Sequence, residues 1–92
     1  MNIYFMPQCG YGEQRVVKDG DSLSINGELF DFSSLKDGET LPSSAIECDH
    51  VVGSVSRVNG EVEVAIISIY SEADTSNINK KPMVNAPDGV IL

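Results

Sequence analysis

Short apolar runs alternate with turn signals along this chain. Five Asx-Gly pairs divide the sequence, at positions 19–20, 26–27, 37–38, 59–60 and 88–89. Such pairs suit two-residue hairpin turns, whose central residues need positive φ. The runs between them are rich in Val, Ile and Phe, which favour strands. The pattern therefore predicts a mostly β protein, an antiparallel meander of about five to seven short strands.

Residues around the first Asn-Gly turn alternate between apolar and polar. Pairing the strands across this turn places Leu23 opposite Phe30 and gathers the apolar side chains on one face. Pairing across the preceding Asp-Gly turn places Val16 opposite Leu23, on the same face. Residues from about 14 to 32 are therefore expected to form a three-stranded meander.

The second Asn-Gly turn joins two strands with a different pattern. Pairing across it places Arg57 opposite Val62 and Gly53 opposite Ile66. Near the turn the second strand alternates, but its later part, residues 65–69, is apolar on both faces. We expect that part to enter a region covered on both sides. Gly53 is expected to mark a bulge or a close backbone contact.

The remaining segments give weaker signals. Residues 2–6 form a further expected strand, which Pro7 should end. Residues 43–47 could make one short helical turn, with Ser43 or Ser44 as cap and Glu47 near its third position. The sheet could stay open, form a sandwich or close partly into a barrel; the sequence leaves all three open.

The composition changes after Tyr70. Residues 71–92 are polar and contain two prolines, with one late strand expected at 83–84 or 90–92. We therefore expect an antiparallel β domain over residues 1–70. The following segment, 71–92, is expected to be a polar tail packed on the domain or on a partner copy.

The charge balance excludes some classes of partner. Six Lys and Arg stand against 14 Asp and Glu, a net charge of −8. Nucleic acid and anionic membranes both require clustered cations, so neither is an expected partner. No apolar run reaches the length of a membrane span, and the first residues lack the pattern of an export signal. The acidic surface fits solubility or a basic partner protein.

Reactive side chains concentrate at residues 47–50, Glu-Cys-Asp-His. In an extended chain Cys48 and His50 would share a face, where they could bind a metal or activate a thiolate. A zinc site needs three or four ligands, however, and Cys9 is the one further thiol. The spacing of the two cysteines suggests no disulfide, and a cytosolic origin predicts that both are free. No nucleophile elbow, phosphate loop or patterned carboxylate pair occurs. We therefore expect no catalytic residue, no metal or other cofactor, and no enzyme activity.

The middle of the chain carries a longer pattern of turns and core residues. It combines a Gly-Asp turn, LSINGELFDFS, LPSSAI and VSRVNGE, and its positions are Gly20, Asp21, Leu23, Ile25 to Glu28, Phe30 to Ser33, Gly38, Leu41, Pro42, Ala45, Ile46, Val55, Arg57, Gly60 and Glu61. Over residues 19–67 the chain resembles a family of small uncharacterised proteins encoded in phage and prophage tail regions. It departs from them at CDHVVG, which lacks their aromatic residue, and after Tyr70. No activity is established for that family, so no functional residue is carried over.

This resemblance implies a phage-derived product tied to tail or tail-fibre assembly. The expected function is that of a non-enzymatic structural or assembly accessory, made in the bacterial cytoplasm, with the virion left open as a final location. It would act by protein–protein contact with a tail or fibre protein, with itself, or with both. The alternative is an acidic decoy that occupies the nucleic-acid site of a host protein.

Two groups of residues carry these expectations. The structural turn residues are Asp19, Gly20, Asn26, Gly27, Asn59 and Gly60. The candidate contact residues are Arg57, Glu61, Glu63, Met83, Val84 and Val90. The contacts are expected to form at unpaired strand edges and along the tail, through strand addition.

Overall fold

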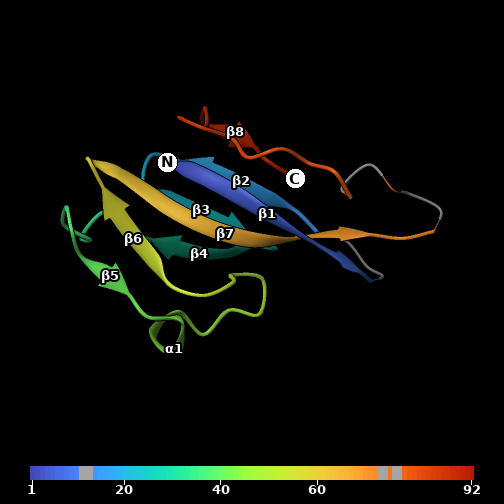
Figure 1. The fold of residues 1–92 in the computed structure, drawn as a ribbon, viewed down its shortest axis with the longest axis horizontal. Helices are drawn as coiled ribbons and strands as arrows, with labels where there is room; N and C mark the ends of the chain where they lie inside the picture. The colour runs from blue at the N-terminus through green and yellow to red at the C-terminus, as the bar shows by residue number, and fades with distance from the viewer. Residues whose placement is uncertain (11–13, 73–74, 76–77) are drawn as a thin grey trace.

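Two four-stranded sheets lie face to face in the computed structural model, which describes residues 1–10, 14–72, 75 and 78–92 (Figure 1). Sheet A has the order β1 (Asn2–Cys9), β7 (Glu61–Tyr70), β6 (Val55–Val58) and β5 (Thr40–Leu41). Sheet B has the order β4 (Glu28–Asp31), β3 (Ser22–Ile25), β2 (Val16–Asp19) and β8 (Gly89–Val90). One short helix, α1 (Ser43–Ile46), follows β5. The predicted mostly β fold with one helical turn is confirmed, and the arrangement is the sandwich among the three left open.

The core lies between the two sheets. In sheet A the even-numbered residues of β7 point inward, and in sheet B alternate residues of β2 and β3 do the same. The side chains with almost no exposure are Ile3, Val16, Leu23, Val55, Val62, Val64, Ile66 and Ser68. Branched aliphatic residues therefore fill most of the interior, as a chain without Trp requires.

The β3–β4 hairpin has the predicted register, with Leu23 opposite Phe30. Its turn residues Asn26 and Gly27 have φ of 50° and 86°, the two positive values that a type I′ turn needs. The predicted pairing of Val16 with Leu23 is wrong: Val16 lies opposite Ile25. The loop is Gly20–Asp21 rather than Asp19–Gly20, with positive φ at Gly20 only, as a type II′ turn requires. Because this moves the register by two residues, Val16 still faces the core.

The β6–β7 hairpin has Arg57 opposite Val62, as predicted. Farther from the turn the prediction fails, because Val51 rather than Gly53 pairs with Ile66. Two extra residues on the first strand separate the regular pairing from this bridge, and Gly53 lies among them with φ of 71°. The expectation that Gly53 marks an irregularity is confirmed.

Strand β1 departs from the predicted antiparallel meander. It pairs in parallel with β7, and it continues through Pro7 to Cys9. Ile3 exchanges both backbone hydrogen bonds with Met83 on the outer edge, so alternation also points the nitrogen of Pro7 to that edge. A proline whose missing N–H faces an edge costs no ladder bond to β7, which is why the strand does not end there.

Helix α1 begins without the predicted serine cap. Pro42 is the N-cap and makes no side-chain hydrogen bond, while Glu47 is the C-cap with φ of 52° rather than a residue of the first turn. Ile46, its buried residue, anchors this turn to the core.

The last ten residues pack on the domain. Met83 pairs with Ile3 at the edge of sheet A, and Ala86 donates its N–H to the Met1 carbonyl at 2.9 Å. Farther on, β8 pairs with β2, and the Ile91 N–H bonds to the Val16 carbonyl at 2.7 Å. One segment therefore connects the outer strands of both sheets on the same side of the sandwich (Figure 1).

Candidate functional site

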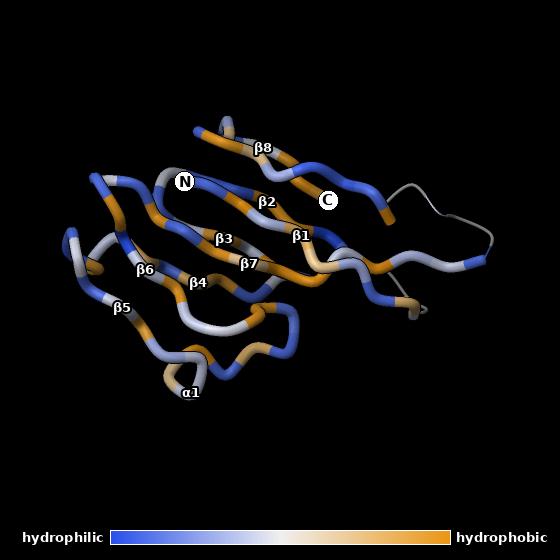
Figure 2. Tube along the Cα trace, in the orientation of Figure 1, coloured by the Kyte–Doolittle hydropathy of each residue, from blue (hydrophilic) through white to orange (hydrophobic). Residues whose placement is uncertain are grey.

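The outer face of sheet A carries a row of apolar side chains. Because Val62, Val64 and Ile66 of β7 point into the core, the odd-numbered Ala65 and Ile67 between them point outward. The parallel register sets Tyr4 of β1 beside Ala65 and Met6 beside Ile67. Figure 2 shows the resulting run of apolar residues along the middle of β7.

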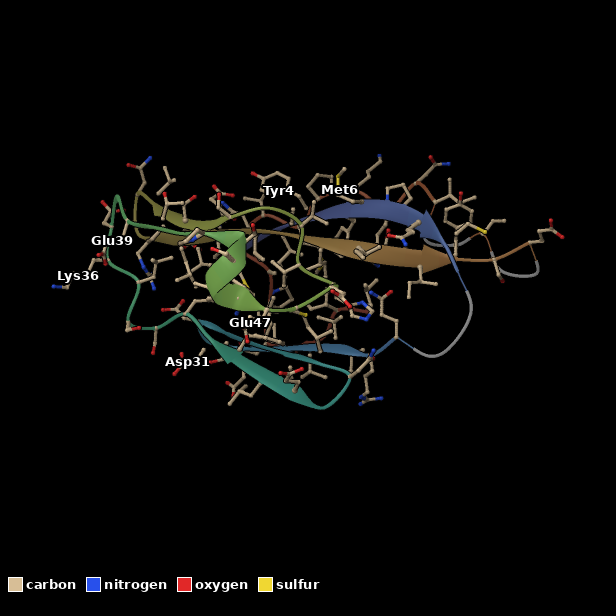
Figure 3. All side chains as sticks on the ribbon, turned by 90° about the horizontal axis from the view of Figure 1, so that it is seen from below. Tyr4, Met6, Asp31, Lys36, Glu39 and Glu47 are labelled. Atoms are coloured by element: carbon tan, nitrogen blue, oxygen red, sulfur yellow. The ribbon has the colours of Figure 1, made fainter. Side chains whose placement is uncertain are left out.

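Tyr4 and Met6 are exposed, whereas Ala65 and Ile67 are half-buried. Tyr4 is 42% exposed and Met6 is 50% exposed, and Figure 3 shows both on the side of sheet A that points away from sheet B. Val52, 38% exposed, lies on the other side of β7, where its N–H bonds to the Ala65 carbonyl. Within the described part of the chain, no strand or helix lies over this face (Figures 1 and 3). We call Tyr4, Met6, Val52, Ala65 and Ile67 the outer patch.

One end of the outer patch is acidic. Glu63 lies opposite Asn2 and accepts a hydrogen bond from the Asn2 amide at 3.1 Å. Its carboxylate also raises the pKa of Tyr4, first through a hydrogen bond and then through its charge. Its Oε2 atom is buried and has no hydrogen-bond partner. Glu61, two residues earlier, forms an ion pair with the amino group of Met1.

The other end of the outer patch is neutral and polar. Gln14 donates its side-chain amide N–H to the Ile67 carbonyl at 2.6 Å and accepts the Ile69 N–H at 2.9 Å. The Gln14 side-chain amide thus takes the place of a neighbouring strand's backbone beside Ile67 and Ile69 of β7. His50 lies alongside, with Nδ1 3.3 Å from the same amide nitrogen.

Arg57, a candidate contact residue, makes its contacts inside the molecule. Its guanidinium donates to the carbonyls of Leu35, Gly60 and Phe32 and to the Asp21 carboxylate, and its side chain is 13% exposed. Asp21 lies in the β2–β3 turn, so this side chain connects the two sheets. In this structure Arg57 is a clamp rather than a surface residue.

The tail candidates divide between the domain and the surface. Met83 pairs with Ile3, whereas Val84 is 68% exposed beside it. Val90 pairs with Val17 through its backbone and leaves 62% of its side chain exposed on the outer side of sheet B. Val84 thus lies at the edge of β1, whereas Val90 lies on sheet B, away from the outer patch.

Five of the six turn candidates lie in two-residue loops. Asn26, Gly27, Asn59 and Gly60 all have positive φ, as does Gly20, whereas Asp19 is the last residue of β2. The five residues with positive φ therefore have a conformational role, and none of the six reaches the outer patch.

Cys48 and His50 have different surroundings in this structure. Cys48 packs against the core, whereas His50 contacts Gln14 at the edge of β7. Both cysteines are free thiols, Cys9 exposed and Cys48 half-buried. Within the described ranges, no three His, Cys, Asp or Glu side chains come together in a group that could hold a metal ion.

Comparisons with family models, with curated proteins and with solved structures each found no match. Among the described residues, no helix is long and apolar enough to cross a membrane.

Sequence reasoning named Glu63 but missed the outer patch beside it. Its signals were present: residues 65–69 are apolar on both faces, and residues 2–6 are an apolar strand. The missing step was the parallel pairing of β1 with β7, which brings Tyr4 and Met6 beside Ala65 and Ile67. A contact between residues 61 positions apart leaves no local mark in the sequence.

Proposed function

We propose that this protein is a non-enzymatic accessory of phage tail or tail-fibre assembly, and that it acts by protein–protein contact through the outer patch. The observation that carries the contact is an exposed apolar sheet face that includes Tyr4 and Met6. Contiguous exposed apolar side chains are typical of interaction sites in soluble proteins, and Tyr and Met are enriched there.

The tail context rests on the resemblance over residues 19–67. That resemblance covers the turns and core positions of both hairpins but not residues 1–10, which supply two of the five residues of the outer patch. The resemblance therefore supports the tail context, and the outer patch separately supports the protein–protein contact. The partner would be a tail or fibre protein met in the bacterial cytoplasm during assembly.

The acidic-decoy alternative receives less support from the arrangement of carboxylates. A decoy needs carboxylates that are free to meet cations. Here Asp21, Asp88 and Glu61 are in ion pairs, while Asp37 and Glu39 accept backbone N–H groups within the 36–60 region. Much of the negative charge thus serves the protein's own turns.

The test is capture from bacteria in which the surrounding phage genes are induced, with mass spectrometry of what is retained. Wild type is compared with Met6→Lys, and with Leu29→Lys as a control, since Leu29 is 67% exposed on sheet B. We expect a tail or fibre protein to be retained by wild type and Leu29→Lys but lost with Met6→Lys. Equal retention by all three variants would count against the outer patch. Salt-sensitive retention of a host DNA-binding protein would favour the decoy.

A further inference from the structure

Glu63 is a carboxylate without a cation at the border of an apolar surface. The three ion pairs of the described residues use Glu61, Asp88 and Asp21, so Glu63 has neutral partners only, Asn2 and Tyr4. One of its oxygens is buried with no hydrogen bond of standard geometry. Glu63 as a whole is only half-buried, and a hydrogen bond from a cationic donor to its carboxylate would be stronger than the neutral one from Asn2.

The outer patch therefore has one charged end, which gives it a direction along β7. Glu63 precedes Ala65 and Ile67 on β7, so the carboxylate is followed by apolar positions at about 7 Å intervals along the strand. A cation on a partner would thus be attracted at the Glu63 end.

We propose that the outer patch binds a partner segment whose apolar side chains cover Tyr4, Met6 and Ile67 and whose Lys or Arg pairs with Glu63. This inference rests on the proposed contact function and adds the partner's chemistry and its direction on the sheet. The net charge of −8 agrees with a basic partner and disfavours a second copy of this chain on the same face.

The probe is a synthetic peptide with one terminal arginine followed by four valines that alternate with serines. Its control has glutamate in place of arginine and is otherwise identical. Binding is followed by the methyl NMR signals of Met6 and Ile67, with those of Leu29 and Val90 on sheet B as internal controls. We expect the arginine peptide to shift the first two signals and leave the other two in place.

The decisive comparison is a charge swap at Glu63. Glu63→Lys is expected to weaken the arginine peptide at least tenfold and to bind the glutamate peptide instead, whereas Glu28→Lys, an exposed carboxylate on β4, should change neither. Thermal unfolding of each variant establishes that it is folded.

Four results would overturn the inference. Equal binding of both peptides at Met6 would mean that the patch is apolar without a charge requirement, and the contact function would stand. Shifts confined to sheet B would place the basic partner elsewhere. Shifts of Met6 that grow with protein concentration alone would mean that a second copy covers the face. No shift with either peptide removes the proposed chemistry, while the capture experiment with Met6→Lys still decides the contact function.

Discussion

Single polar side chains tie together parts of this chain that lie far apart in sequence. Lys18 is buried on β2, and its ammonium reaches the Asp88 carboxylate at 2.7 Å, just before β8. Asp88 also accepts the Gly20 N–H at 2.9 Å. Arg57 does the same between the sheets. A small sandwich with few aromatic residues thus uses charged hydrogen bonds, which are stronger than neutral ones, to join its layers and its edges.

The Asp88 carboxylate should make stability depend on acid. Its hydrogen bond to Lys18 holds the pKa of Asp88 below the usual value of 3.8. The folded state therefore favours the ionised form, and this contribution is complete above pH 3.8 and lost as the pH falls through the lower folded pKa. Asp88→Asn should lower the free energy of unfolding at pH 7 and flatten its decline below pH 4.

Urea denaturation from pH 7 to pH 2 measures both effects. Asp19→Asn is the matched control, because Asp19 is an exposed carboxylate on the same strand as Lys18. Its unfolding free energy should stay near that of the wild type at pH 7. If Asp88→Asn and Asp19→Asn gave the same curve, the Lys18 pair would have no part in acid stability.

At the scale of elements, tight turns fix the hairpins. Asn59 and Gly60 have φ of 52° and 83°, values that match the right-handed twist of the flanking strands in a type I′ turn. A Cβ at Gly60 would meet no atom within 4 Å, so its cost is that of the backbone alone. The turn thus fixes the register that places Val62 and Val64 in the core and Glu63 outside.

Gly60→Ala should destabilise the protein by about 1–2 kcal/mol, the cost of a left-handed conformation for an L-residue. Gly10→Ala is the control, because Gly10 has no positive φ and a Cβ there would meet Ile69 at 3.5 Å, an ordinary contact. Thermal unfolding should show a fall of several degrees for Gly60→Ala and little change for Gly10→Ala. Equal midpoints would mean that the turn does not carry the strain assigned to it.

What could be predicted from the sequence follows the range of each interaction. The Asn-Gly hairpins and the pairs Leu23–Phe30 and Arg57–Val62 depend on neighbours, and they were predicted correctly. The Asp19-Gly20 loop was misplaced because Gly20 also suits the first position of another turn type. The parallel pairing of β1 with β7 depends on residues far apart in the chain, so it could not be predicted from local patterns. The outer patch, which depends on that pairing, could not be predicted either.

At the scale of the whole molecule, the C-terminal segment holds the two sheets together on one side. It bonds to Ile3 of sheet A through Met83 and to Val16 of sheet B through Ile91 and Leu92. Composition alone described residues 71–92 as a polar tail, yet Ala86 and Ile91 in it are buried. A few apolar side chains in a polar segment are enough to close the open edge of a small sandwich.

If the segment acts as one unit, loosening it at one sheet should loosen it at the other. Ile91→Ala removes a side chain that is 6% exposed and should cost about 2–4 kcal/mol. Val90→Ala, at a site 62% exposed, is the neighbouring control and should cost less than about 0.5 kcal/mol.

Hydrogen exchange of the Ile3 and Val16 amides reports on the two sheets separately. We expect Ile91→Ala to speed exchange at both amides, since opening of the segment breaks the Met83 and Leu92 bonds together. Faster exchange at Val16 alone would show that the segment is two independent contacts, and that each sheet keeps its own edge.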